Sequence, residues 1–137
     1  MPADRVLAID PGREKCGLAV VHREQGLIDK TIIATVDLPD RVATLAAAHN
    51  LTTVIIGDGT TTQTAQAVLA AITVKGQRLT IVPVNEYRST DEARVRYWRC
   101  HPPRGLKRLL PTGMLVPPVP VDDFVAVILA ERYFSGR

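Results

Sequence analysis

Cysteine, aromatic residues and long apolar runs are scarce in this sequence. Its 137 residues include two cysteines, Cys16 and Cys100, and neither has a second Cys or His at metal-ligand spacing, which excludes a disulfide framework and a zinc site. No stretch approaches the roughly 18 to 20 consecutive apolar residues that span a bilayer, and the first residues lack the apolar region of a secretory signal. We therefore expect no membrane association and a cytoplasmic location.

What is present is the composition of an ordinary globular domain. Hydrophobic residues make up 46% of the chain and charged residues 23%, which is the balance of a folded protein rather than a disordered one. A chain of this length is about one domain, so we expect residues 1–137 to form a single unit. Six of the ten prolines lie between Pro102 and Pro120, which predicts a proline-rich basic loop without regular structure at about residues 101–120.

The net charge of +3 is unevenly distributed. The segment 88–108 contains seven bases and two acids, a net charge of +5, while the rest of the chain carries −2. The seven bases are Arg88, Arg94, Arg96, Arg99, Arg104, Lys107 and Arg108. Tyr87, Tyr97 and Trp98 lie in or beside this segment, and bases mixed with aromatic rings suit phosphates and unstacked nucleobases. The segment predicts nucleic-acid binding, although a solvated helix face with a few packed rings has the same composition.

Apolar periodicity predicts five strands and four helices. The expected strands are residues 6–9, 16–21, 27–36, 53–57 and 79–84. Helices are expected behind Asp37 and Asp40, over 61–75, from a capping box of Ser89 and Glu92 to about residue 100, and over 121–134. Short turns join the first three strands, and helices lead to the last two. The sequence therefore predicts an α/β fold, a mixed five-stranded sheet with helices on both faces.

Three acids follow or begin apolar elements. Asp10 ends the first strand, Glu86 follows the fifth, and Asp122 starts the last helix. Pockets of open α/β sheets form at the carboxyl ends of parallel strands, so the three can face one another. Carboxylates gathered in this way repel unless a divalent cation neutralises them, and oxygen ligands select Mg²⁺ or Mn²⁺. The trio predicts metal-dependent phosphodiester hydrolysis, whereas Asp10 alone or Asp122 alone is better explained as a cap or turn residue.

The chain also resembles the YqgF family over nearly its whole length. Asp10, Gly12 and Gly17 match the family's opening Asp-x-Gly-x4-Gly pattern, and residues 54–59 partly match its strand ending in Gly-Leu-Pro. Residues 85–93 resemble its Asp-Glu-Arg-x-Ser/Thr-Thr-x-x-Ala motif, and residues 121–126 its terminal Val-Asp-x-x-x-Ala helix.

The resemblance implies an RNase H-like fold and a nuclease. YqgF proteins are related to RuvC-like Holliday junction resolvases and include pre-16S ribosomal RNA nucleases, so precursor 16S rRNA or branched DNA is the implied substrate. It also implies that Asp10, Glu86 and Asp122 are the catalytic, metal-binding acids. Asn85 and Tyr87 depart from the family's Asp and Arg, and Arg88 is a candidate to replace that arginine.

Two further acids and the assembly state complete the expectations. We expect Asp58 to be a turn residue, with an extra metal ligand as the alternative, and Asp123 to cap the last helix. The function is expected to be a metal-dependent nuclease; the alternatives are a Holliday junction resolvase and a non-catalytic RNA-binding ribosome assembly factor. A monomer or weak homodimer is expected, because the apolar residues suffice for one core.

Overall fold

A mixed five-stranded sheet forms the centre of the protein. The computed structural model describes residues 3–59 and 62–136. The sheet contains β1 (Arg5–Asp10), β2 (Lys15–His22), β3 (Gly26–Ala34), β4 (Thr53–Gly57) and β7 (Thr80–Val84), in the order β3-β2-β1-β4-β7. β1 to β3 are antiparallel neighbours, and β4 and β7 extend the sheet parallel to β1. The predicted sheet is confirmed.

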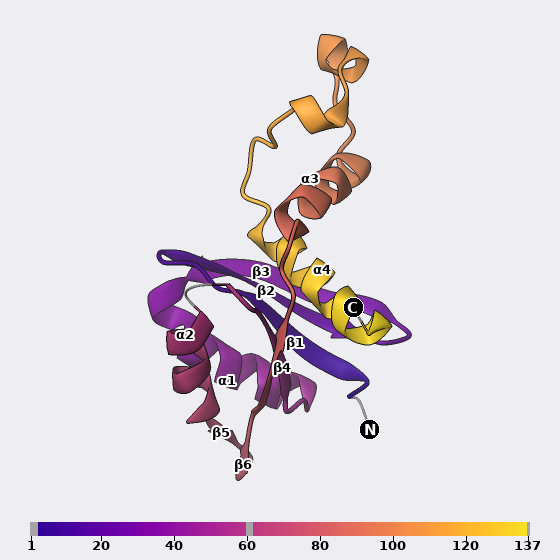
Figure 1. The fold of residues 1–137 in the computed structure, drawn as a ribbon. Helices are drawn as coiled ribbons and strands as arrows, with labels where there is room; N and C mark the ends of the chain where they lie inside the picture. Colours follow the sequence, from indigo (N-terminus) through magenta and orange to yellow (C-terminus); the bar gives the residue numbers. More distant parts are fainter. Residues whose placement is uncertain (1–2, 60–61, 137) are drawn as a thin grey trace.

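Helices cover both faces of this sheet, as the sequence predicts (Figure 1). One face packs against α1 (Leu38–His49) and α2 (Thr62–Ala70). The other face packs against α4 (Asp122–Ser135), and α3 (Ser89–Cys100) packs on α4 in turn. α4 is buried on almost every side because it lies between the sheet and α3.

In the central strand β1, apolar residues follow one another without polar residues between them. Four successive residues, from Val6 to Ile9, are fully buried. Val6 faces the core beneath α4, and Leu7 and Ile9 face the core beneath α1. Both faces of β1 are therefore apolar, as expected for a strand with helices on each side.

The predicted helix over 61–75 is too long. α2 ends at Ala70 and is followed by a short ribbon of β5 (Thr73–Val74) and β6 (Gln77–Arg78). Lys75 and Gly76 join them with φ of 53° and 80°. Two successive left-handed residues make the tight hairpin turn that follows the twist of paired strands. Residue 61, where the helix was expected to begin, lies outside the described residues.

The predicted capping box at Ser89 is also wrong. The residue before α3 is Arg88, in a left-handed conformation with φ of 58°, and no side chain caps the helix. Ser89 is already helical and is buried, while the Glu92 side chain contacts Arg132. Arg132 holds the Glu92 side chain, and Ser89 already lies inside the helix, so the local capping pattern does not form.

Residues 101–120, here called the arm, project beyond the end of α3 (Figure 1). The arm contains two short 3₁₀ helices, η2 (Gly105–Leu109) and η3 (Thr112–Met114), so the expectation of no regular structure is wrong there. A third, η1 (Thr35–Asp37), follows β3, so that strand ends before the predicted residue 36. Proline excludes longer helices from the arm but permits single 3₁₀ turns. None of the helices described is long and apolar enough to cross a membrane.

Candidate functional site

The carboxyl ends of β1, β4 and β7 meet at one edge of the sheet. Strand register places Ile9 beside Ile56, and Gly57 beside Val84. Asp10 is the last residue of β1, and Glu86 follows the end of β7 by two residues. Asp10 and Glu86 both line an open cleft at this edge. Parallel pairing thus brings together two of the three predicted acids, as the sheet topology requires.

Asp122 reaches the same edge because Gly17 has no side chain. Gly17 lies opposite Asp10 in the β1–β2 ladder. A Cβ atom built on Gly17 would overlap the backbone carbonyl of Asp122, the first residue of α4. The start of α4 therefore rests directly on β2. This close approach carries Asp122 to the Asp10 carboxyl group.

The environment of Asp10 raises the pKa of its carboxyl group from 3.8 to about 7. Burial is the largest cause, because the charged form loses hydration. Repulsion by Asp122 and then by Glu86 follows, and a side-chain hydrogen bond shared with Asp122 adds to the effect. The protein thus stores unfavourable electrostatic energy at Asp10 that a cation or a proton would relieve.

Asp122 has one buried oxygen with no hydrogen bond. Among the residues that the structure describes, its Oδ2 atom has no hydrogen-bond partner. The ammonium group of Lys15 lies 3.4 Å from this oxygen, which is an ion-pair distance without hydrogen-bond geometry. A buried carboxylate oxygen in this state costs free energy unless another ligand satisfies it.

Glu86 lines the same cleft as Asp10. Cβ atoms built on Gly57 and Gly59 would collide with its carboxylate, so these glycines make room for the side chain. The Glu86 N–H donates to Asp58 Oδ1 at 3.2 Å, and the Asp58 N–H donates to the Val84 carbonyl at 3.1 Å. Burial first, and then the Asp58 charge, raise the pKa of Glu86. Asp58 thus supports the loop that presents Glu86 through a tertiary contact.

The three acids do not form a ready-made metal cage. Within residues 3–59 and 62–136, no group of three His, Cys, Asp or Glu side chains is arranged to hold a metal ion. Asp10 and Asp122 share a hydrogen bond, whereas Glu86 acts on Asp10 through its charge and has Asp58 as its acidic neighbour. The donor chemistry nevertheless fits Mg²⁺ or Mn²⁺, because the groups are carboxylates and one buried oxygen lacks a donor.

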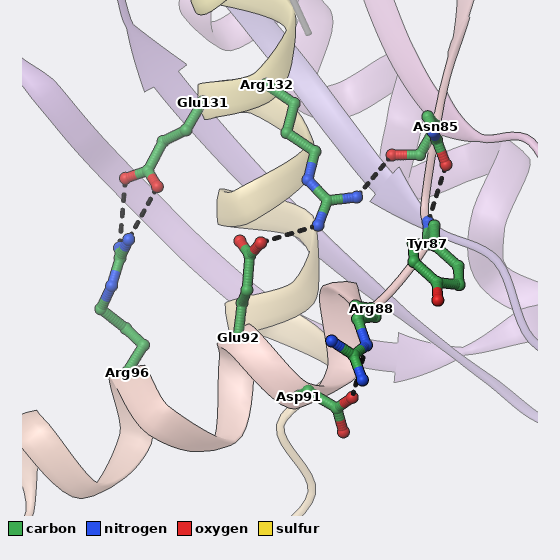
Figure 2. Close-up of polar contacts among 8 residues, drawn as sticks. All are labelled: Asn85, Tyr87, Arg88, Asp91, Glu92, Arg96, Glu131 and Arg132. Carbon is green, nitrogen blue, oxygen red and sulfur yellow. Dashed lines mark hydrogen bonds and ion pairs between the residues drawn. The ribbon is translucent and has the colours of Figure 1, made fainter.

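A buried arginine that sequence reasoning missed supports the loop before Glu86 (Figure 2). Arg132 of α4 is 5% exposed, and its guanidinium donates to the Asn85 carbonyl at 2.7 Å and to Glu92 Oε1 at 3.0 Å. The Asn85 side-chain oxygen accepts a hydrogen bond from the Tyr87 N–H at 2.8 Å. Arg132 therefore joins α4, α3 and the Glu86 loop. Its only signal in the sequence is a base that follows a long apolar run by two residues, after Glu131.

Two of the seven predicted nucleic-acid-binding bases have acidic partners. Arg96 forms a two-pronged pair with Glu131, at 2.7 and 3.1 Å, and Arg88 lies 4.0 Å from Asp91 (Figure 2). The other five are exposed and form no ion pair or hydrogen bond in the part of the chain that the structure describes: Arg94, Arg99, Arg104, Lys107 and Arg108. These five lie on α3 and in the arm.

Asp123 is turned away from the acids. Its Oδ2 atom accepts a hydrogen bond from Lys30 Nζ at 2.7 Å, and its Oδ1 atom accepts one from the Phe124 N–H in the first turn of α4. It therefore satisfies one free N–H of the helix start and fixes α4 to β3.

The fold is shared with solved structures of RuvC. No described protein family matches the chain, and no curated protein matches its sequence. The structure of Thermus thermophilus RuvC is similar over 96% of this chain and 95% of its own, with 16% identity and a TM-score of 0.57. T. thermophilus RuvC in complex with a Holliday junction substrate is similar over 98% of this chain and 96% of its own, with 15% identity and a TM-score of 0.59. The chain therefore has the RNase H-like fold of RuvC.

Proposed function

We propose that this protein is a metal-dependent nuclease that hydrolyses phosphodiester bonds. The observation that carries the proposal is the half-buried Asp10 and Asp122 carboxyl pair at the carboxyl edge of the sheet, with one buried oxygen that lacks a hydrogen bond. Lys15 pairs with Asp122, but the repulsion that raises the pKa of Asp10 remains, and such uncompensated charge is costly in a purely structural role. A site that receives divalent cations explains why the repulsion is retained.

Asp10, Asp122 and Glu86 are the residues that would hold Mg²⁺ or Mn²⁺. When bound, such cations supply an activated water and stabilise the leaving oxygen of an in-line displacement. Lys15, at 3.4 Å from Asp122, offsets part of the negative charge before a cation binds. The Asp58 hydrogen bond and the Arg132 contact at Asn85 hold the loop from which Glu86 projects.

The substrate of this proposal is nucleic acid, most specifically precursor 16S ribosomal RNA. The five unpaired bases of α3 and the arm favour an anionic polymer as the substrate, because their charge has no acidic partner among the described residues. The choice of rRNA rests on the YqgF resemblance. Branched DNA is the competing substrate, since RuvC, which shares the fold, was solved with a Holliday junction. We propose a single domain, acting as a monomer or weak homodimer.

Asn85 in place of the family's Asp gives no reason to prefer a non-catalytic assembly factor. Its side-chain oxygen accepts the Tyr87 N–H, and its backbone carbonyl accepts from Arg132. An aspartate oxygen would make the same turn contact. The departure from the family's Asp therefore leaves the Glu86 loop anchored.

The test measures cleavage of labelled precursor 16S RNA and of a four-way DNA junction while Mg²⁺ or Mn²⁺ is titrated. We expect metal-dependent cleavage of the RNA. Glu86→Gln and Asp122→Asn should lower the rate by more than about 100-fold, since groups that only support metal ligands are already worth about 10- to 100-fold. Asp29→Asn makes the same kind of change at an exposed position of β3 and should retain the rate. RNA cleavage that is independent of metal, or unchanged in either acid variant, would contradict the proposal.

A further inference from the structure

A cleft opens at the base of the arm, apart from the acidic site. It lies between the last turn of α3 and the two legs of the arm, and its lining includes Trp98, His101, Arg104, Lys107 and Val116. Aromatic rings and prolines thus form its apolar wall, and bases stand at its rim. Asp10, Glu86 and Asp122 do not contribute to this cleft.

The rings of the cleft form a stack that ends in an exposed member. Tyr97 is buried, and His101 stacks on it with ring centroids 4.7 Å apart and planes 22° from parallel. His101 Nδ1 also lies 3.3 Å from the Tyr97 carbonyl oxygen, within hydrogen-bond distance, which fixes the imidazole orientation. His101 itself is exposed. A flat aromatic ligand can therefore continue the stack on the outer side of His101.

The charge around the cleft favours a polyanion. No acidic residue occurs between positions 93 and 121, a segment that holds six Lys and Arg residues. Arg104 and Lys107, both in the cleft lining, are exposed and form no ion pair within the described residues. A ligand with a flat ring next to phosphates satisfies both features. Paired bases of a duplex do not offer their ring faces, so a single strand is required.

We infer that the arm cleft binds an unpaired nucleobase of an RNA strand, stacked on His101, with the adjoining phosphates on Arg104 and Lys107. The inference rests on the proposed function and specifies its substrate as RNA with a single-stranded segment. It gives the projecting arm a role in selecting where the strand enters. It also explains why prolines and bases of the exposed arm lie beside the rings at the end of α3.

Trp98 allows the inference to be tested directly, because it is the only tryptophan of the chain and lines the cleft. Its fluorescence is titrated, in EDTA so that no cleavage occurs, with a single RNA strand, an abasic ribose-phosphate strand of equal length and a blunt RNA duplex. We expect the single strand to quench Trp98 and to bind about tenfold more tightly than the abasic strand, since stacking on one ring is worth about 5- to 150-fold. The duplex should leave the fluorescence unchanged.

Two variants separate stacking from charge. His101→Ala should remove the preference for the base-bearing strand over the abasic one, and His101→Phe, which keeps a flat ring, should restore it. Equal binding of the base-bearing and abasic strands by wild-type protein would overturn the inference. Tighter binding of a DNA strand of the same sequence would overturn the assignment to RNA. If Trp98 is quenched as the protein concentration rises in the absence of nucleic acid, the cleft would instead bind a second copy of the chain. Because the assay contains no metal, its failure is distinct from a failure of metal-dependent cleavage.

Discussion

Asp10→Asn is expected to stabilise the metal-free protein while it abolishes cleavage. The Asp10 carboxyl group has its pKa raised from 3.8 to about 7 in the folded state. The folded protein therefore binds a proton more tightly than the unfolded chain, and the free energy of unfolding falls as pH rises from about 4 to about 7. Above that range Asp10 is ionised and the full penalty applies.

The size of this penalty follows from the same pKa. A tenfold change in proton affinity corresponds to about 1.4 kcal/mol, so ionised Asp10 costs the folded protein about 4 kcal/mol. Asparagine keeps the shape of the side chain and removes the charge, which also relieves the repulsion with Asp122 and Glu86. For a chain of this size, about 4 kcal/mol corresponds to a rise in Tm of roughly 10 to 15 °C.

The assay is thermal unfolding at about pH 8 and about pH 4, with EDTA or with excess Mg²⁺ or Mn²⁺. At pH 8 in EDTA the variant should have the higher Tm, and at pH 4 the two Tm values should converge. A cation at about 100 times its Kd should stabilise the wild type by about 2.7 kcal/mol and the variant by much less. Asp29→Asn, at an exposed position of β3, is the matched control and should leave the Tm unchanged. Equal Tm values of wild type and Asp10→Asn at pH 8 in EDTA would refute the electrostatic reasoning, and equal stabilisation by cations would remove Asp10 from the metal site.

Further expectations concern the arm, the packing of α4 and the assembly state. In filter-binding titrations with single-stranded RNA, Lys107→Glu should lower the slope of log Kd against log salt concentration by at least about 0.7. Arg78→Glu on β6, outside the arm, should leave this slope unchanged. Gly17→Ala should lower the free energy of unfolding in urea by about 1 to 3 kcal/mol, because the new methyl group would collide with the Asp122 carbonyl. Gly113→Ala should lower it far less, because its methyl group would have no neighbour within 4 Å. Arg132→Met removes the hydrogen-bond donor of the Asn85 carbonyl, so the free energy of unfolding should fall by about 2 kcal/mol. Cation binding, measured by Mn²⁺ titration, should also weaken. Sedimentation with and without reductant should show a monomer or weak dimer, and a tight reductant-insensitive dimer would favour the resolvase alternative.

The sequence alone determined the sheet and the positions of the acids along it. Runs such as residues 6–9 report local burial, and the short turns and intervening helices fix which strands pair antiparallel and which parallel. Since parallel strands end at one edge, Asp10 and Glu86 could be placed together without coordinates. The local rules failed where tertiary contacts compete with them, as at Ser89, where Arg132 draws Glu92 away from the helix start.

Only the tertiary structure decided how the groups at that edge meet. The contact between Asp122 and Asp10 depends on α4 resting on Gly17, and the support of the Glu86 loop depends on Arg132 reaching the Asn85 carbonyl. These contacts join residues that are distant in sequence and follow no period. Periodicity reports which face of an element is buried, whereas the partner on that face is set by close packing of the whole chain.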